Sequence, residues 1–159
     1  MATEAKTIVP DGERRQVTVL FADLVGFTAF SERSGEEGAF ALMRRVAGLM
    51  TSVVEEQGGS VRSFTGDGIM ALFGDPTALE DAPLRACRAA LTIHDRLAGA
   101  AKDIAATHGI RPQLRIGINT GPVIVGKVPS GDGSTVTALG DTVNLAFRLQ
   151  ALAGRRALF

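Results

Sequence analysis

The pattern of apolar and polar residues divides the chain into strands and helices. Gln16–Asp23 is apolar on both faces, which is typical of a strand in the middle of a sheet. In Glu36–Gln57 and Asp81–His108 apolar residues recur at helical spacing, which predicts two long helices, and Asp141–Ala153 predicts a third helix. Shorter β segments are predicted at Ser60–Thr65, Ile69–Phe73, Leu114–Asn119, Val123–Val128 and Val136–Leu139.

Glycine-containing turns join the short β segments. Gly66-Asp67-Gly68 predicts one hairpin, and Thr120-Gly121-Pro122 predicts a second. The apolar stripes of the two long helices are expected to face the core: Phe40, Met43, Val46, Met50 and Val53 in the first, and Leu84, Cys87, Leu91, Leu97 and Ile104 in the second. Strands and helices do not alternate strictly, which favours an α+β fold with helices on one face of a mainly antiparallel sheet.

The length of 159 residues is typical of a single domain. The first residues are polar, and Pro10, Asp11 and Gly12 interrupt any regular element there. We therefore expect residues 1–15 to form a flexible tail and residues 16–159 to form the domain.

Composition narrows the possible partners and locations. Lysine plus arginine and aspartate plus glutamate both number 17, so the zero net charge gives no reason to expect a nucleic-acid or membrane partner. The single cysteine, Cys87, excludes an internal disulfide and a cysteine-based metal cluster. The N-terminus has no signal-like apolar core, and the longest apolar run is far shorter than a membrane span. We expect a soluble, cytoplasmic protein.

Two aspartates, Asp23 and Asp67, each stand where a strand meets a turn. If the hairpin of Ser60–Phe73 pairs beside the first strand, the two carboxylates converge at one end of the sheet. Carboxylates in this arrangement can bind two divalent cations about 4 Å apart, which clamp the attacking and leaving oxygens of a phosphoryl transfer. Taken alone, Gly66-Asp67-Gly68 is more simply explained as a type I′ turn.

Other polar groups can serve the same chemistry. The turn from Leu24 to Thr28 precedes a helix start, where backbone N–H groups can hold phosphate oxygens, although neither a P-loop nor a dinucleotide-binding glycine motif is present. Asn144 and Arg148 share one helix face and can orient a hydroxyl and neutralise a phosphate, but an ordinary solvent-facing surface is the simpler explanation. Arg115, in the strand LRIGIN, either faces solvent or reaches a triphosphate.

Together, four stretches resemble the catalytic domain of class III nucleotide cyclases: VTVLFADLVGFT, FTGDGIMALFG, LRIGINTGPVIVG and LGDTVNLAFRLQ. They occur in the order and spacing of that family and cover residues 16 to about 153. The resemblance implies a ferredoxin-like, palm-type α/β sandwich. It also implies conversion of a nucleoside triphosphate to its 3′,5′-cyclic monophosphate and pyrophosphate, with two divalent cations (Mg²⁺ or Mn²⁺), in intracellular signal transduction.

The resemblance assigns a role to each matching position. Asp23 and Asp67 match the metal-binding aspartates, and the carbonyl of Leu24 matches a further metal ligand. Phe27 and Thr28 lie in the turn that holds phosphate. By resemblance, these residues bind the cations and the triphosphate of one site.

The remaining matches concern the transition state and the assembly. Arg115 matches a triphosphate contact, Asn144 the residue that orients the ribose, and Arg148 the arginine that stabilises the transition state. In the family two chains associate head to tail, so Asn144 and Arg148 would serve the partner's site. The resemblance therefore implies a homodimer with two shared sites.

Three features depart from the family pattern. The lysine that usually reads the purine falls at Ser63, and its acidic partner falls at Thr137, a substitution also found among members that use ATP. The Glu/Cys pair of guanylyl-type members is absent as well, so ATP is the expected substrate. The family fold also continues past the last helix, whereas this sequence stops at GRRALF, so we expect an incomplete domain with an open sheet edge.

Three hypotheses follow for function. The first is an adenylate cyclase with all metal and transition-state positions filled. The second is a catalytically impaired, cyclase-like module for nucleotide binding or dimerisation, which the altered base-reading positions and the short C-terminus favour. The third, a diguanylate cyclase, lacks its GG[DE]EF hairpin, because the hairpin here reads TGDGIM.

Overall fold

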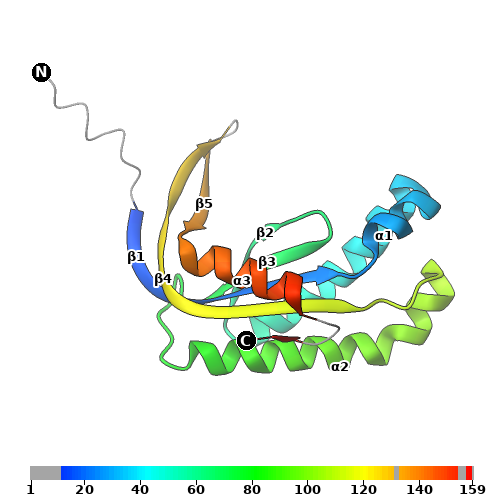
Figure 1. Cartoon of the computed structure of the whole chain (residues 1–159). Coiled ribbons are helices and arrows are strands. Elements are labelled where there is room, and N and C mark those ends of the chain that lie inside the picture. The colour runs from blue at the N-terminus through cyan, green and yellow to red at the C-terminus, as the bar shows by residue number, and fades with distance from the viewer. Residues whose placement is uncertain (1–11, 131–132, 154–156, 159) are drawn as a thin grey trace, which may run out of the picture.

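The computed structural model describes residues 12–130, 133–153 and 157–158, with side chains described within 13–126 and 140–153. In chain order the elements are β1 (Gly12–Leu24), α1 (Phe27–Glu56), β2 (Ser60–Phe64), β3 (Gly68–Phe73), α2 (Ala82–His108), β4 (Leu114–Ser130), β5 (Gly133–Leu139), α3 (Asp141–Leu152) and β6 (Ala157–Leu158) (Figure 1). Within this part of the chain the strands form one sheet in the order β2-β3-β1-β4-β5, with β6 also beside β4. The β4–β6 pair is parallel and the other pairs are antiparallel.

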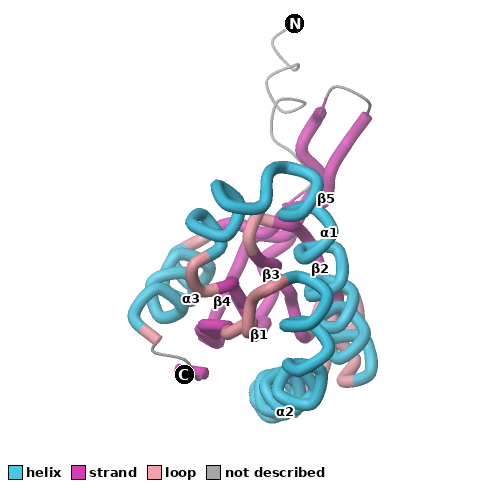
Figure 2. The backbone as a smooth tube through the Cα atoms, turned by 90° about the vertical axis from the view of Figure 1, so that its right-hand side faces the viewer, coloured by secondary structure: helices cyan, strands magenta, loops and turns pink. Residues whose placement is uncertain are grey.

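Helices cover both faces of the sheet (Figure 2). On one face, α1 and α2 pack over a large core in which Leu20, Ile69 and Ile116 are fully buried. On the other face, α3 packs over a smaller cluster that includes Val17 and Val19. The α+β, palm-type fold is confirmed, but the prediction that all helices lie on one face is wrong. Strand β1 is apolar on both sides because each side meets a helix.

The predicted hairpin at Thr120-Gly121-Pro122 is also wrong, because β4 is a continuous strand that pairs with β1 over the whole length of β1. Gly121 has a different role. A Cβ there would lie 2.5 Å from Oγ1 of Thr142 in α3, and a Cβ at Gly117 would lie 2.2 Å from the backbone N of Gln150. These two glycines of β4 let α3 lie directly on the strand.

Both ends of the described chain contain strand that the sequence did not predict. Residues 12–15, expected in the flexible tail, are the start of β1 and pair with residues 123–126 of β4. The predicted tail is therefore too long, because residues 12–15 belong to the sheet. Residues 1–11 lie outside the described part of the chain. At the other end, β6 follows α3, which was the last element predicted from the sequence. It pairs with Ile116 and Gly117 of β4.

The long helices bury much of the predicted apolar stripes but not all of them: Val46, Met50 and Val53 of α1 and Leu97 and Ile104 of α2 are buried. Helix α1 is interrupted at Gly35 (φ 78°, ψ 175°), which separates a short first segment from a long second one. However, Phe40, Leu84 and Leu91 are 68%, 49% and 60% exposed. The buried face of α2 is instead rich in alanine: Ala82, Ala86, Ala89 and Ala90. Small side chains let α2 pack closely, and Leu84 and Leu91 face outward, whereas Leu97 is buried. In the described part, no helix is long and apolar enough to cross a membrane.

Candidate active site

The end of β1 brings Asp23 close to Asp67. Strand β3 pairs with β1 so that Asp23 lies opposite Gly68, and the N–H of Leu24 donates a hydrogen bond to the carbonyl oxygen of Asp67 (2.8 Å). A Cβ at Gly68 would lie 1.9 Å from the carbonyl oxygen of Ala22, so only glycine allows this approach. The predicted convergence of the two aspartates is confirmed.

The turn that carries Asp67 is not the type I′ turn considered from sequence. That turn needs positive φ at both central residues. Gly66 has a φ of 89°, but among the described residues only glycines have positive φ, so Asp67 does not. The N–H of Thr65 donates to the carbonyl oxygen of Gly68 (2.9 Å) and closes the hairpin.

The Asp23 carboxyl is electrostatically unusual. Burial, followed by a hydrogen bond with Asp67 and the charge of that residue, raises the pKa of Asp23 to about 7. A hydrogen bond from Gln150 and the charge of Arg115 oppose this shift. The Oδ1 atom of Asp23 is buried without a hydrogen-bond partner. Two adjacent carboxyls with an unpaired buried oxygen fit a divalent cation.

No group of three or more histidine, cysteine, aspartate or glutamate side chains that could hold a metal occurs in the described residues. A cation at this position would therefore depend on Asp23, Asp67 and backbone oxygen such as the carbonyl of Leu24. Hard divalent cations accept such all-oxygen ligand sets and complete them with water or substrate phosphate.

Arg115 adds positive charge to the same end of the sheet. It lies directly opposite Asp23 in the pairing of β1 with β4. Its side chain is half-buried, and its Nε is buried without a hydrogen-bond partner. Of the two explanations left open from sequence, a plain solvent-facing position does not fit this environment. A guanidinium beside the Asp23 carboxyl is suited to binding an anion together with a cation.

The first turn of α1 follows Asp23 after a short turn. Gly26 has a φ of 72°, and the first helical hydrogen bond runs from the N–H of Phe30 to the Gly26 carbonyl (3.1 Å). The N–H groups of Phe27 and Thr28 therefore precede the helical ladder, as those of any first turn do. Phe27 is half-buried against the core and Phe30, whereas Thr28 is exposed. This turn can accept phosphate oxygens.

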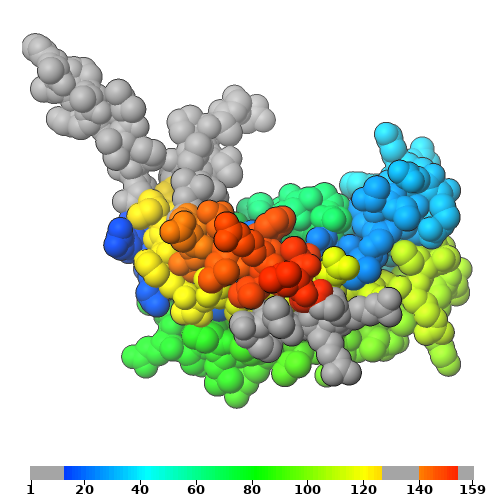
Figure 3. Space-filling view, viewed as in Figure 1, coloured from blue at the N-terminus to red at the C-terminus, as the bar shows by residue number. Residues whose placement is uncertain are grey.

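Helix α3 presents two different faces. Thr142, Ala146 and Gln150 face the sheet and are buried. Asn144 and Arg148 are exposed, two residues away from Ala146 in either direction and hence on the opposite face. In Figure 3, α3 lies open on the surface of the molecule. The structure thus brings Asp23, Asp67 and Arg115 together, and does not bring Asn144 and Arg148 to them within one chain.

The two positions expected to contact the base also lie apart from Asp23 along the sheet. Ser63 is exposed on β2, beside an irregularity in the pairing with β3. Thr137 lies on β5 opposite Gly126 of β4, and its side chain is outside the described part. Strands β2 and β5 are at opposite ends of the strand order, so one chain does not combine these two residues.

Sequence analysis missed one residue of this site, Gln150. Its Nε2 donates a hydrogen bond to Oδ2 of Asp23 at 2.9 Å. The only signal in the sequence is the four-residue spacing of Thr142, Ala146 and Gln150, which marks one helix face. Because two of these three residues are polar, that face does not look like a buried one.

The end of this sheet thus gathers two neighbouring carboxyls, an arginine and the start of a helix, groups whose chemistry suits phosphate and divalent cations. The chain belongs to the family of adenylate and guanylate cyclase catalytic domains, whose pattern matches residues 9–157.

Individual cyclases are also similar to this chain. Adenylate cyclase 1 of Rhizobium meliloti (strain 1021) is 34% identical over 139 residues, which are 87% of this chain and 21% of that protein. This chain thus spans about a fifth of that relative. Among solved structures, the guanylyl cyclase Cya2 is 33% identical with a TM-score of 0.86, and the match covers 91% of this chain and 73% of that one. The adenylyl cyclase CyaB from P. aeruginosa is 28% identical with a TM-score of 0.85, covering 91% and 76%. Both substrate types therefore occur among similar proteins.

Proposed function

We propose that this domain is an adenylate cyclase that converts ATP to 3′,5′-cyclic AMP and pyrophosphate in intracellular signalling. The observation that carries the proposal is the meeting of Asp23 and Asp67 around a buried, unpaired carboxylate oxygen. The absence of the guanylyl-type base-reading pair, with Ser63 and Thr137 in its place, supports ATP as the substrate. A substrate of this kind fits the cytoplasmic location expected from the sequence.

In the proposed mechanism Asp23, Asp67 and the Leu24 carbonyl would hold two divalent cations, Mg²⁺ or Mn²⁺. When bound, such cations would acidify the ribose 3′-hydroxyl and neutralise triphosphate charge. The N–H groups of Phe27 and Thr28 bind phosphate oxygens at the start of α1. The protein's main contribution is to orient the α-phosphate for in-line attack by the 3′-oxygen.

Arg115, Asn144 and Arg148 supply the remaining polar contacts. Arg115 neutralises triphosphate charge from the Asp23 side. Asn144 orients the ribose, and Arg148 stabilises negative charge that develops in the transition state. Because this charge develops only in the transition state, Arg148 acts mainly on turnover.

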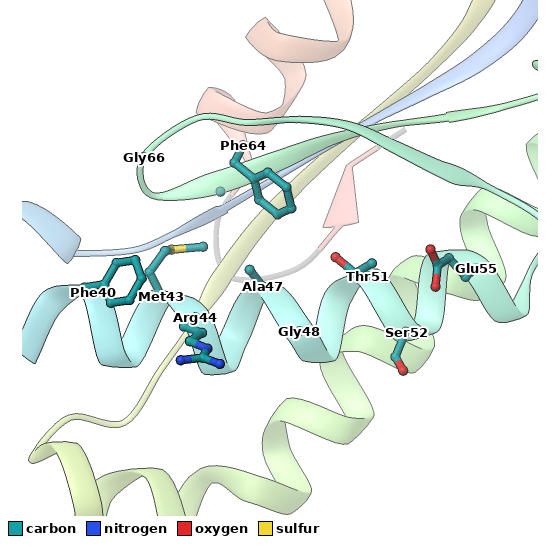
Figure 4. A pocket seen from close by; sticks show the side chains of 11 residues that line it. Phe40, Met43, Arg44, Ala47, Gly48, Thr51, Ser52, Glu55, Phe64 and Gly66 are labelled. Atoms are coloured by element: carbon teal, nitrogen blue, oxygen red, sulfur yellow. The ribbon is translucent and has the colours of Figure 1, made fainter.

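We further propose that the working unit is a head-to-tail homodimer. The outward position of Asn144 and Arg148 supports this, since a second copy can bring them to Asp23 and Asp67. Exposed apolar surface also supports it. Phe40 of α1 and Phe64 of β2, 68% and 66% exposed, line a groove beside the Asp67 hairpin (Figure 4). Contact between copies would cover such surface.

The alternative is a cyclase-like module without turnover. The altered positions Ser63 and Thr137 favour it, whereas the retained aspartates and Arg148 favour activity. Product analysis separates the two. The purified chain is incubated with ATP or GTP and with Mn²⁺ or Mg²⁺, and cyclic nucleotide is identified by mass. Cyclic AMP that disappears in Asp23→Ala supports the cyclase, whereas no product from a folded dimer supports the inactive module.

Mixing variants tests the shared site. Asp67→Ala and Asn144→Ala should each be inactive, because each removes one contribution to both sites of its homodimer. A heterodimer of the two retains one intact site, so mixing should restore part of the activity. Heterodimers that form but remain inactive would rule out the shared arrangement.

A further inference from the structure

Gln150 is a buried polar side chain that links α3 to the Asp23 carboxylate. It is 3% exposed, and its Nε2 donates to Oδ2 of Asp23 at 2.9 Å across 127 residues of sequence. The contact depends on close packing, because α3 lies against β4 at Gly117, where a Cβ would be 2.2 Å from the Gln150 backbone N. Gly117 therefore allows α3 to lie close enough to the sheet for Gln150 to reach Asp23.

The hydrogen bond gives the two oxygens of Asp23 different environments. Oδ2 accepts from Gln150, whereas Oδ1 is buried and has no hydrogen-bond partner. A donor on one oxygen restricts rotation of the carboxylate and leaves the other oxygen available to a ligand. An amide does this without adding positive charge, so it does not repel a cation as a lysine or arginine at the same position would.

We infer that Gln150 is a positioning residue for the cation site: it fixes the orientation of the Asp23 carboxylate through the Oδ2 hydrogen bond. This inference rests on the proposed role of Asp23 as a cation ligand. Side chains that hold a metal ligand by hydrogen bonding affect metal affinity strongly even though they do not touch the metal. Because Asn144 and Arg148 lie on the same helix, Gln150 also joins the carboxylate of one site to the helix offered to the partner's site.

The test uses Gln150→Met, which keeps the length and apolar stem of the side chain and removes the donor. Binding of Mn²⁺ alone is measured by the loss of the free-ion electron paramagnetic resonance signal, so the readout does not require catalysis. We expect Mn²⁺ to bind about 10-fold more weakly to the variant than to the parent chain.

The matched control is Thr142→Val, at the other end of the same helix. It removes another buried hydrogen bond from α3 to the sheet, the one that Oγ1 of Thr142 donates to the carbonyl oxygen of Pro122 (2.8 Å). The control should lower the unfolding midpoint, as loss of a buried hydrogen bond does, and leave Mn²⁺ affinity unchanged. Equal losses of affinity in the two variants would show that Gln150 only packs α3, and would overturn the inference.

Failure of the proposed function can be told apart from failure of the inference about Gln150. If Asp23→Ala binds Mn²⁺ as the parent does, Asp23 is not a ligand, and both the cation site and the role of Gln150 are refuted. If Asp23→Ala loses binding while a folded Gln150→Met retains it, only the inference about Gln150 is refuted.

Heterodimers provide a second readout. In the mixture of Asp67→Ala and Asn144→Ala chains, the intact site takes its aspartates from the Asn144→Ala chain. Gln150→Met should raise the Mn²⁺ concentration needed for half-maximal activity when placed in that chain, and leave it unchanged when placed in the Asp67→Ala chain. The reverse pattern would assign Gln150 to the helix offered across the interface and overturn its role at Asp23.

Discussion

Gly68→Ala tests directly whether the close approach of the hairpin to β1 creates the site. The added Cβ would lie 1.9 Å from the carbonyl oxygen of Ala22, whereas ordinary contacts begin near 3.4 Å. The obstructing atom is backbone, so β3 and its hairpin must move away by about 1.5 Å, the difference between these distances. Overpacking of this kind costs about 1 to 3 kcal/mol of unfolding free energy.

The functional loss should exceed what this destabilisation explains. Asp67 precedes Gly68 and moves with it, so the distance between the two carboxylates increases. A displacement of about 1 Å in a catalytic group can lower the rate by about 100-fold. We therefore expect Gly68→Ala to lose Mn²⁺ binding and at least about 99% of cyclase activity at temperatures where it remains folded.

The assay combines urea unfolding, Mn²⁺ titration and product analysis on the same preparation. Gly66→Ala is the matched control, because it changes the same turn but its Cβ meets no atom within 4 Å. It should cost about 1 to 2 kcal/mol through its positive φ and keep Mn²⁺ binding. A folded Gly68→Ala chain with parental Mn²⁺ affinity and turnover would refute the reasoning.

Three further changes have defined outcomes. Arg148→Ala should lower turnover by about 100-fold or more with little change in the KM for ATP, and near-parental turnover would contradict the mechanism. Gly99→Ala, in open space on α2, should raise unfolding free energy by about 1 kcal/mol without affecting activity, and a loss of stability would contradict the open position. For Asp75, burial alone would raise the pKa, but hydrogen bonds from Arg15 and Arg62 outweigh it and lower the pKa. That stabilisation is fully present above about pH 4 and is lost as the pH falls through the lower folded-state pKa. Asp75→Asn should therefore cost about 3 kcal/mol at pH 7 and clearly less at pH 3 in urea unfolding, whereas equal losses would contradict the ion-pair account.

Much of the fold could be predicted because local signals agree with the tertiary structure. The apolar segment before Asp23 forms the central strand, and Gly66 and Gly68 mark the hairpin correctly. At Gly121 the same kind of signal misled, because the glycine accommodates Thr142 of α3 and not a turn. Sequence shows that a position needs a small residue, but not whether the reason is backbone conformation or a neighbouring helix.

The candidate site was predictable only in part for a similar reason. The carboxylates stand at strand ends, so their convergence follows from strand pairing. Gln150 contributes through a contact between α3 and β1 that no local pattern encodes. Likewise, Phe40 and Leu91 look like core residues by spacing, and only the packing of the helices shows that they are exposed.

The absence of side chains at Gly117 and Gly121 has a mechanical consequence. Helix α3 touches β4 at two points about two helical turns apart, through the Gln150 backbone at Gly117 and the Thr142 side chain at Gly121. The helix therefore cannot slide or roll over the strand without collision. Helix α3 and the sheet then behave as one rigid block. In the proposed homodimer, a regulatory signal that changes how far Arg148 reaches toward the partner's site must move the helix and the sheet together. We therefore expect regulation to act by reorienting one subunit against the other.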